Sequence, residues 1–393
     1  MKICFYCDSI FTFGGVQRVL AGLARELSRR HEVTILTRDD PADEDRSMYG
    51  LQDAALKFRY LRYPKLPFYE NIPCKAYSLL YKKILPQNAW TTRLYTYSSF
   101  PFAYRKLLIG ALREEDYDVV VGVHVFPSLF LAGIRKHIRA KVVGWMHNSY
   151  EAFFGQPGIW LWKGEKRFKY QSKALDEIVV LTRNDQRLYQ ERLGVRTSVL
   201  YNPLTLETKG QGHALYKKFL AVGRMTPFMK GFDILVEGFA LFAQENSEWT
   251  LDIVGEGEEE DLIRSLIAKH GLESRVKIHS FTKDIQRYYA AASVYVLSSR
   301  WEGFGLVLIE AMSHGLPVIA SDVPVGKELL GDKSFGFLFE NGNPASLAGQ
   351  MRRVAELAEL GELGELGEEA KAYAGEFEAG YIAGIWEKTI LKN

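Results

Sequence analysis

The fold of this chain is indicated most clearly by the stretch from Ser298 to Asp322, which reads SSRWEGFGLVLIEAMSHGLPVIASD. It follows the apolar run Val294–Leu297, which predicts a buried strand. It then contains a Gly-Phe-Gly turn, a helical run from Leu306 and a second apolar run at 316–320. A strand, a glycine turn, a helix and a strand in this order form one unit of a parallel sheet, with a ligand-binding loop after the first strand.

Two carboxylates flank the start of the helix in this stretch. Glu302 lies before the helix, where it can accept hydrogen bonds from hydroxyl groups, and Glu310 lies two turns into it. The unpaired N–H groups of the first helical turn, at 304–307, favour anionic or hydroxyl-rich ligands. Two glutamates alone would also fit the acid/base pair of a glycoside hydrolase. Beside a helix start, they suit a sugar joined to a phosphate.

Length and composition indicate two well-cored domains. The chain has 393 residues, of which 47% are hydrophobic and 25% are charged. Its cysteines, Cys4, Cys7 and Cys74, are too few for a disulfide framework, and the first two fall in an apolar strand. We interpret them as core residues of a protein from a reducing compartment.

Apolar runs alternate with helical patterns along both halves, as in parallel, doubly wound α/β sheets. Strands are predicted at 2–7, 32–36, 119–123, 141–145, 177–181, 198–201, 218–222, 250–254, 275–278, 294–297, 317–320 and 336–339. Helices are predicted at 15–28, 126–137, 185–191, 232–244, 259–270, 285–291, 306–313 and 344–358. The turn-rich segment 202–212 is the predicted linker.

Two segments do not follow this alternation. Residues 40–105 show little clean periodicity and are interpreted as a long excursion over the surface. Residues 355–369 repeat a three-residue unit, AEL or GEL, which favours a marginal helix interrupted by glycines and without chemistry of its own.

Loops after two predicted strands of the second half carry residues that suit an anionic ligand. Arg224 and Lys230 lie in the loop GRMTPFMKG, and a guanidinium together with an ammonium group suits a diphosphate. Gly255 opens the turn GEGE after the next strand. Surface charge and a plain tight turn are the alternative interpretations of these two loops.

In the first half, Gly14 and Gly15 open the first helix, where paired glycines let the backbone approach a ligand. They do not form the G-x-G-x-x-G pattern, so a dinucleotide is poorly supported, and a plain strand-to-helix turn is the alternative. His147 follows the strand 141–145 and is taken as the one histidine at a strand end in this half, with a purely structural role as the alternative.

A metal site is not expected. Asp116 and Asp118 have the D-x-D spacing by which many sugar transferases hold a metal–diphosphate complex, but they precede a strand and so lie opposite the ligand-binding edge. No other cluster of acids or histidines has the spacing of ligands. We therefore expect no metal and no cofactor, with the charge of a leaving group met by cations and helix ends.

The formal net charge of +2 conceals a basic segment. Between Lys57 and Lys106 there are ten Lys or Arg residues and one acid, Glu70, among many tyrosines and phenylalanines. This segment is either a solvated face or a platform for anionic lipid headgroups; nucleic acid is less favoured because no recognition motif accompanies the charge. No signal peptide or transmembrane run is visible, so a cytoplasmic protein with peripheral membrane contact at most is expected.

Taken together, these motifs resemble the retaining nucleotide-sugar glycosyltransferases of family 4, which have the GT-B fold. The resemblance rests on the two glutamates in SRWEGFGLVLIEAM, G-R at 223–224, K-G at 230–231, V-G-E-G at 254–257 and the N-terminal G-G. It covers nearly the whole chain and is weak across 40–105. It implies two Rossmann-like, doubly wound α/β domains facing across a cleft, with 1–203 for the acceptor, 204–376 for the donor and a helix at about 377–393 crossing back to the first domain.

The resemblance also implies roles for individual residues. Arg224 and Lys230 would neutralise the donor diphosphate, Glu302 would bind the transferred sugar, and Glu310 would bind the ribose. His147 would lie near the transferred sugar and the acceptor, and with Arg224, Lys230 and Glu302 it forms the expected catalytic set. The other expected donor contacts are Gly14 and Gly15 over the diphosphate, Gly303, Phe304, Gly305, Leu306 and Val307 at the helix start, and Gly255, Phe281 and Thr282 near the base.

The expected reaction moves a hexose or N-acetylhexosamine, with retention and without a metal, from a nucleotide sugar to a lipid-linked or surface-glycan acceptor. UDP is preferred as the nucleotide. A transferase for a small soluble acceptor and a catalytically silent nucleotide-sugar-binding protein remain open. A sugar-nucleotide epimerase of similar architecture would fit the motifs poorly.

Overall fold

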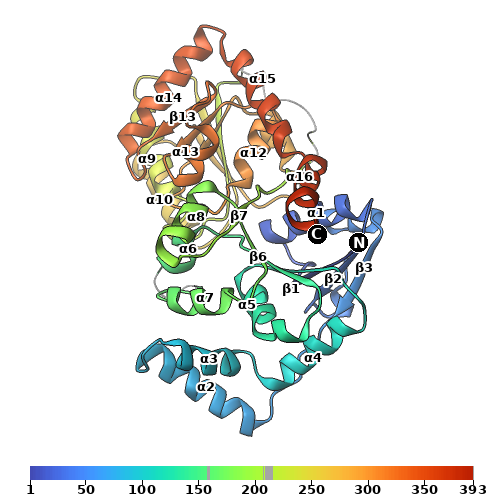
Figure 1. Cartoon of the computed structure of the whole chain (residues 1–393). Coiled ribbons are helices and arrows are strands. Elements are labelled where there is room, and N and C mark those ends of the chain that lie inside the picture. Colours follow the sequence, from blue (N-terminus) through green and yellow to red (C-terminus); the bar gives the residue numbers. More distant parts are fainter. Residues whose placement is uncertain (157–159, 207, 209–215, 393) are drawn as a thin grey trace. The chain divides into compact units, whose positions relative to one another are not determined.

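The computed structural model describes residues 1–156, 160–206, 208 and 216–392, and the chain divides into two compact units (Figure 1). Unit 1 comprises Met1–Pro203 and Ala379–Asn393, and unit 2 comprises Leu204–Glu378. Part of the predicted linker 202–212, namely 207 and 209–212, lies outside the described residues.

Unit 1 is built on a parallel sheet of seven strands in the order β3-β2-β1-β4-β5-β6-β7. The strands are β1 (Lys2–Cys7), β2 (Glu32–Thr37), β3 (Leu56–Tyr60), β4 (Val119–Val123), β5 (Lys141–Trp145), β6 (Glu177–Val180) and β7 (Ser198–Val199). The central strands are apolar at nearly every position because helices cover both faces of the sheet (Figure 1). The strand order reverses between β1 and β4, which is where such sheets bind ligands.

The helices of unit 1 are α1 (Gly15–Ser28), α2 (Phe68–Lys83), α3 (Ala89–Ser99), α4 (Phe102–Arg113), α5 (Val125–Ile134), α6 (Tyr150–Phe154), α7 (Glu165–Ser172), α8 (Arg183–Leu188) and α16 (Ala379–Trp386). They connect the strands, except for α16, which follows unit 2, while α2 and α3 pack on each other and α3 packs on α7. In α1, apolar residues recur three and four positions apart from Val19 to Leu27, so one side of the helix is buried.

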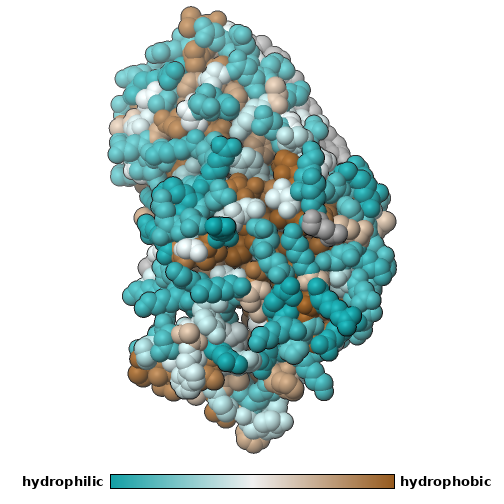
Figure 2. All heavy atoms as spheres, viewed as in Figure 1, coloured by the Kyte–Doolittle hydropathy of each residue, from teal (hydrophilic) through white to brown (hydrophobic). Residues whose placement is uncertain are grey.

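The interpretation of 40–105 as a long excursion over the surface agrees with the exposed helices of this segment but not with its strand. The segment contains β3, which extends the sheet by pairing with β2, and the helices α2 and α3. It lacks clean periodicity because β3 is an edge strand that is only partly buried, and because α2 contains Pro73 and buries only Tyr81. Figure 2 shows hydrophobic residues, in brown, on the outer surface of these two helices.

The last helix, α16, belongs to unit 1 although it follows unit 2 in the chain. The Trp386 ring packs edge-on against that of Trp145, with 4.8 Å between ring centroids. The carboxylate of Glu387 lies 3.0 Å from His31 Nε2, and the Lys141 ammonium group donates to the backbone carbonyl of Ile390 at 2.8 Å. The C-terminal segment therefore completes the core of unit 1.

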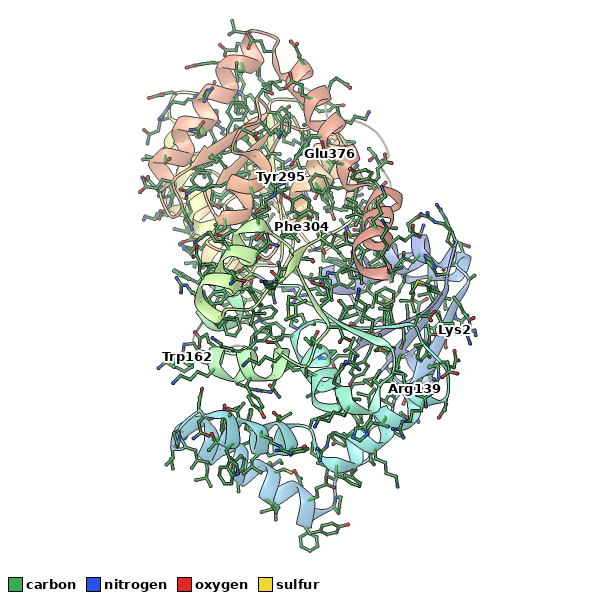
Figure 3. The ribbon with its side chains drawn as sticks, viewed as in Figure 1. Lys2, Arg139, Trp162, Tyr295, Phe304 and Glu376 are labelled. Carbon is green, nitrogen blue, oxygen red and sulfur yellow. The ribbon has the colours of Figure 1, made fainter. Side chains whose placement is uncertain are left out.

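Unit 2 has a parallel sheet of six strands in the order β10-β9-β8-β11-β12-β13. The strands are β8 (Lys218–Val222), β9 (Thr250–Val254), β10 (Val276–His279), β11 (Val294–Leu297), β12 (Val318–Ser321) and β13 (Gly336–Phe339). The helices are α9 (Phe232–Ala243), α10 (Glu260–Lys269), α11 (Gln286–Ala290), α12 (Leu306–Ser313), α13 (Pro324–Leu330), α14 (Pro344–Glu359) and α15 (Leu363–Ala374). Fully buried Tyr295 lies inside this unit (Figure 3), where its hydroxyl donates to the Val222 carbonyl at 3.3 Å.

The three-residue repeat forms the end of α14 and most of α15. Gly361, with φ of +78°, separates the two helices, so the predicted glycine break is found there. Gly367 instead lies within α15, and a Cβ atom at this position would lie 2.4 Å from the Gly315 carbonyl oxygen. This glycine allows α15 to pack closely in unit 2, and the marginal stability expected of the helix stays a prediction.

Candidate functional site

The loops that carry the predicted donor-binding residues meet at one edge of unit 2. Because all six strands are parallel, the segments that follow β8, β9, β10 and β11 lie at the carboxyl edge of the sheet. The strand order reverses between β8 and β11, and β8 is followed by Arg224 while β11 is followed by Glu302. The two most informative loops therefore flank the position where doubly wound sheets bind ligands.

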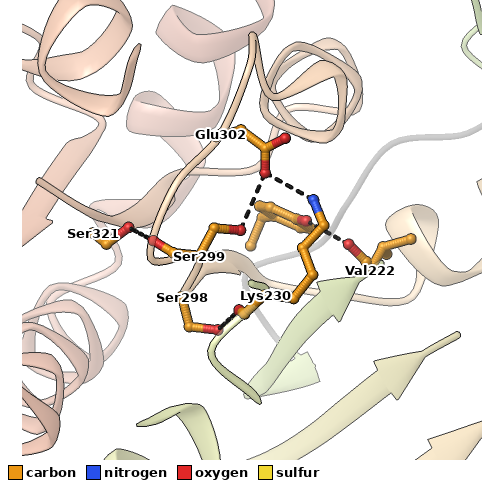
Figure 4. A network of polar contacts seen from close by, with 7 residues as sticks. Val222, Lys230, Ser298, Ser299, Glu302 and Ser321 are labelled. Atoms are coloured by element: carbon orange, nitrogen blue, oxygen red, sulfur yellow. Dashed lines mark hydrogen bonds and ion pairs between the residues drawn. The ribbon is translucent and has the colours of Figure 1, made fainter. Parts of the chain in front are cut away.

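Lys230 and Glu302 form an ion pair between these two loops (Figure 4). The Lys230 ammonium group donates to Glu302 Oε2 at 2.8 Å, and the same oxygen accepts from the Ser299 hydroxyl at 3.1 Å. Each side chain of the ion pair is 15% exposed, so the pair is mostly shielded from water and remains reachable by a ligand. The cation expected for the diphosphate and the carboxylate expected for the sugar thus occupy one position.

Further hydrogen bonds fix the two loops to each other. The Ser298 hydroxyl donates to the Lys230 carbonyl at 2.9 Å (Figure 4). The Arg300 guanidinium binds both carboxylate oxygens of Asp233, at 2.9 and 2.6 Å, in the bidentate geometry that makes such pairs directional. These hydrogen bonds restrict the backbone conformation of the loop that carries Lys230, as a preorganised ligand site requires.

Gly231 is required where the two loops touch. Its φ is +62°, and a Cβ atom there would lie 2.2 Å from the Ser298 carbonyl oxygen. A similar contact joins the loops after β8 and β9, because a Cβ atom on Gly255 would lie 1.9 Å from the Gly223 carbonyl oxygen. The glycines predicted to allow backbone approach to a ligand thus also allow the loops to approach each other.

The start of α12 lies directly after Glu302. Gly305 precedes the helix with φ of +70°, and the amides of Leu306 and Val307 fall in the first turn, where a helix leaves N–H groups for a ligand. Gly303 lies in the turn between Glu302 and the buried Phe304, whose ring packs on Phe377 within unit 2, with 6.1 Å between ring centroids (Figure 3 labels Phe304).

Glu310 lies on the buried side of α12. It is 2% exposed, and its Oε2 atom accepts a hydrogen bond from the Tyr289 hydroxyl at 3.0 Å. Tyr289 in turn stacks on His314, with 5.0 Å between ring centroids. A buried carboxylate that is held in this way has its orientation set before any ligand arrives.

The remaining predicted donor residues of unit 2 lie at the same sheet edge. Arg224 is exposed after β8, and Gly255 is buried after β9. Phe281 and Thr282 follow β10, where the Phe281 ring is exposed and the Thr282 hydroxyl accepts from the Asp284 amide at 3.1 Å. These residues therefore line the edge on the β9–β10 side of the ion pair.

In unit 1, Gly14 and Gly15 lie at the start of α1, after the loop that follows β1. The Gly14 amide donates to the Tyr49 hydroxyl at 3.1 Å, and that hydroxyl donates to the Thr12 carbonyl at 3.0 Å. Gly15 is exposed, so its backbone is accessible at the carboxyl edge of the sheet.

His147 is buried at the end of β5, and it is not the one histidine at a strand end. His124 directly follows β4, at the reversal of strand order. Burial lowers the pKa of His147, and the neighbouring His124 lowers it further. The expectation of one such histidine was wrong, although the run Val119–Val123 before His124 matches the pattern used to select His147.

The two histidines are held in an aromatic environment. The His147 ring lies 4.1 Å from that of Trp145, and the His124 ring lies 4.4 Å from that of Trp160. His124 has a φ of +83°, which is strained for a residue with a Cβ atom, while its amide donates to the Trp145 carbonyl at 2.8 Å. Strain at a ligand-binding edge is typical of a residue whose placement serves function.

Burial determines the charge of both rings. It lowers the pKa of His124 to about 4 and holds the pKa of His147 well below its ordinary value. Both rings are therefore neutral near pH 7. His147 Nε2 is buried without a hydrogen-bond partner among the described residues, so it can still bond to a ligand hydroxyl.

The other candidates from the sequence have structural roles. Asp118 accepts from the Lys2 amide at 2.7 Å, at the amino edge of the sheet, away from the ligand-binding loops. Cys4 and Cys7 are buried and unpaired, and burial raises the pKa of both thiols. Within the described ranges, no group of three or more His, Cys, Asp or Glu side chains is arranged to hold a metal ion.

Two Rossmann-like units with parallel sheets and ligand loops at their carboxyl edges define the GT-B class of glycosyltransferase folds. Family models agree with this class: "Glycosyltransferase Family 4" matches residues 13–208, and "Glycosyl transferases group 1" matches residues 209–373. An uncharacterised glycosyltransferase of Haemophilus influenzae is 32% identical over 250 residues, which are 62% of this chain and 68% of that protein. The chain belongs to glycosyltransferase family 4.

Other similar proteins are more distant. The poly(ribitol-phosphate) α-N-acetylglucosaminyltransferase of Staphylococcus aureus is 26% identical over 61% of this chain and 48% of its own. Among solved structures, HepE of Anabaena with UDP and glucose has a TM-score of 0.73 at 20% identity, covering 100% of this chain and 99% of its own. TarM has a TM-score of 0.76 at 17% identity, covering 98% of both chains. At these identities the solved structures support the fold.

Proposed function

We propose that this glycosyltransferase moves a hexose or N-acetylhexosamine from a nucleoside diphosphate sugar, with UDP as the preferred nucleotide, to a hydroxyl group of a lipid-linked or surface-glycan acceptor. The observation that carries the proposal is the Lys230–Glu302 pair beside the start of α12. One position then offers a cation for the diphosphate, a carboxylate for sugar hydroxyls and free helix amides for either.

Unit 2 would bind the donor through this edge. Arg224 and Lys230 would meet the diphosphate, the amides of Leu306 and Val307 would bind phosphate or sugar oxygens, and Glu310 would accept from the ribose hydroxyls. The UDP in the Anabaena HepE structure supports the choice of nucleotide by fold analogy.

The reaction would proceed by attack of an acceptor hydroxyl on the anomeric carbon. The new carbon–oxygen bond forms on the face from which the diphosphate leaves, the bond to the diphosphate oxygen breaks, and the hydroxyl proton passes to the departing phosphate. Retention of configuration follows from this front-face geometry. The rate enhancement would come from positioning and from cations that stabilise the developing charge on the diphosphate, without a metal ion or other cofactor.

Unit 1 would bind the acceptor at its own carboxyl edge. Neutral His147, with an unpartnered buried Nε2, can accept a hydrogen bond from a hydroxyl of the acceptor or of the transferred sugar. The relative that modifies poly(ribitol phosphate) in Staphylococcus aureus supports a surface-glycan acceptor. The basic segment 57–106 supports one that is presented at an anionic membrane. In the part of the chain that the structure describes, no helix has the length and apolarity needed to span a bilayer.

Thermal-shift titration with a panel of nucleotides and nucleotide sugars tests the donor. A ligand at 100 times its dissociation constant should add ~2.7 kcal/mol of stability. Lys230→Ala should weaken donor binding by ~1.5–3 kcal/mol, the range for a charge-assisted contact.

Lys218→Ala is the matched control, because Lys218 forms a 3.0 Å ion pair with Asp252 but lies at the amino end of β8. The control should leave donor affinity unchanged. Equal affinity of the Lys230 variant and the wild type would contradict the assignment of the diphosphate to this edge.

Three further measurements test the remaining parts of the proposal. Activity that survives exhaustive chelation supports independence from metals, and the anomeric configuration of the product tests retention. Efficient transfer to a small soluble acceptor, with no gain from a lipid-linked one, would favour the alternative of a soluble acceptor. Tight nucleotide-sugar binding without transfer or hydrolysis would favour a catalytically silent binding protein.

A further inference from the structure

The helices α2 and α3 form a hairpin that is firmly attached to unit 1. The rings of Tyr81 on α2 and Tyr95 on α3 stack with 4.3 Å between centroids, and the hydroxyls of Tyr81 and Thr92 are 2.8 Å apart. On its other side, α3 is held by α7, where buried Arg167 and Gln171 bind Tyr95 and Thr96 at 3.3 and 2.8 Å. The hairpin therefore has a defined conformation in which one face of α2 is left uncovered.

The uncovered face is strongly apolar. Phe68, Ile72 and Leu79 of α2 are 75%, 63% and 56% exposed, and their spacing of four and seven residues aligns them along the helix. Trp90, at the start of α3, is 69% exposed. Figure 2 shows this hydrophobic surface at the outer side of the hairpin. A row of large apolar side chains without a partner indicates an interaction surface.

A depression of about 450 Å³ lies beside this apolar row, between α2, α3 and the start of α4. It is lined by Lys75, Ser78, Leu79, Lys82, Ser98 and Tyr104, among others. Lys75 and Lys82 are two helical turns apart and therefore face the same way. Neither lysine is in an ion pair within the described residues, so both ammonium charges are available to an anion.

We propose that this depression binds the phosphate headgroup of an anionic membrane lipid while Phe68, Ile72, Leu79 and Trp90 enter the lipid interface around it. This proposal rests on the proposed function, because it names the surface by which a lipid-linked acceptor is approached. Lysines that border apolar and aromatic side chains match a bilayer, whose anionic headgroups lie directly above its hydrocarbon. One acid, Glu70, is present among the ten basic residues of 57–106, so a negatively charged surface meets little repulsion.

Co-flotation of the full chain with vesicles tests the proposal. The wild type should bind vesicles of phosphatidylcholine with phosphatidylglycerol and should not bind phosphatidylcholine alone. The variant Lys75→Gln/Lys82→Gln should partition about 30-fold more weakly, which corresponds to ~1 kcal/mol for each charge near the surface. The control Lys136→Gln/Lys173→Gln removes two exposed lysines elsewhere in unit 1 and should bind as the wild type does.

The apolar row is tested by Phe68→Ser/Ile72→Ser, which should lower partitioning at unchanged net charge. A similar loss in the control variant, no loss in the Lys75/Lys82 variant, or wild-type partitioning of the Phe68/Ile72 variant would overturn the proposal. Binding of millimolar inorganic phosphate to a protein that binds no vesicles would assign the depression to a soluble phosphate. This result would also overturn the proposal.

Nucleotide-sugar binding, measured on the same variants by thermal shift, separates this proposal from the proposed function. The lysine and apolar variants should bind donors as the wild type does, because the substituted residues belong to unit 1 and none of them is a predicted donor contact. Vesicle binding with no donor binding would refute the proposed function and leave this surface in place. Donor binding with no vesicle binding would refute the proposed membrane surface and leave the proposed function standing.

Discussion

Replacing Glu302 by glutamine should separate the binding of a free nucleoside diphosphate from that of the intact nucleotide sugar. In the structure, Glu302 Oε2 accepts from Lys230 at 2.8 Å, so a diphosphate that recruits this ammonium group competes with the carboxylate. Glutamine keeps the shape of the side chain and removes its charge. The lysine is then free for the diphosphate, whereas the sugar hydroxyls lose a charged acceptor.

The size of the effect follows from the burial of the pair. Exposed pairs contribute up to ~1 kcal/mol, and breaking a fully buried pair costs ~3–5 kcal/mol. Both side chains here are 15% exposed, so we expect ~1–2 kcal/mol for this pair, or about 5- to 30-fold in affinity. Loss of a charged hydrogen bond to the sugar costs ~1.5–3 kcal/mol. The ratio of the dissociation constant of the nucleotide sugar to that of the free diphosphate should therefore rise by roughly 10- to 150-fold.

Isothermal titration calorimetry with UDP and UDP-sugars measures both constants. The affinity for UDP should increase by about 5- to 30-fold in Glu302→Gln, and the affinity for the sugar nucleotide should not share this increase. Glu245→Gln is the control, because it breaks the 2.7 Å pair with Arg352 between the end of α9 and the start of β9, at the amino edge of the sheet, and should leave the ratio unchanged. A loss of UDP affinity equal to the loss for the sugar nucleotide would refute the reasoning.

Three other predictions concern backbone, pH and assembly. Gly231→Ala should lower both the melting temperature and the nucleotide affinity, because φ is +62° and the new Cβ atom meets a carbonyl oxygen of the neighbouring loop; a variant with wild-type affinity would show that the loops adjust freely. The pKa of His124 is lowered to about 4 from 6.5 and that of His147 is also lowered, so the unfolded state binds more protons in this window. Stability should then rise with pH from about 4 to 6.5, by at most ~1.4 kcal/mol per pH unit for each histidine, and should level off above; an unchanged slope in urea titrations of His124→Asn/His147→Asn would contradict this. Trp386→Ala should cost ~3–5 kcal/mol of stability in unit 1, visible in calorimetry as a lowered melting temperature of that unit, and a loss below ~1 kcal/mol would mean that α16 is only loosely bound.

The parallel sheets could be predicted because their strands are short apolar runs followed by glycines. The bounds of β8, β9 and β11 agree with the predicted ranges, since each strand is buried on both faces and its apolar run ends where the loop begins. The glycines at the carboxyl edge of unit 2 could be placed after these strands for the same reason. Where a strand is half exposed, as β3 is, polar residues interrupt the apolar run, and the sequence no longer predicts a strand.

The contacts of the site were less accessible to sequence reasoning. Lys230 and Glu302 are 72 residues apart, and their pairing depends on the reversal of strand order between β8 and β11, which composition does not reveal. His124 carried a signal that was overlooked, because it follows an apolar strand just as His147 does. The helices α2 and α3 expose their apolar side chains, so the usual assumption that apolar residues face a core does not apply to them.

The return of α16 to unit 1 affects how the chain is made. The core of unit 1 includes Trp386 and Ile390, yet all of Leu204–Glu378 is translated between Pro203 and this helix. At ~5–20 residues per second, that interval lasts roughly 10–35 s. During this time the hydrophobic surface of unit 1 on which α16 packs stays exposed in the nascent chain. Unit 2 can complete its own core in the same interval. Unit 1 begins synthesis first and finishes folding last, so nascent chains should depend on chaperones at this surface.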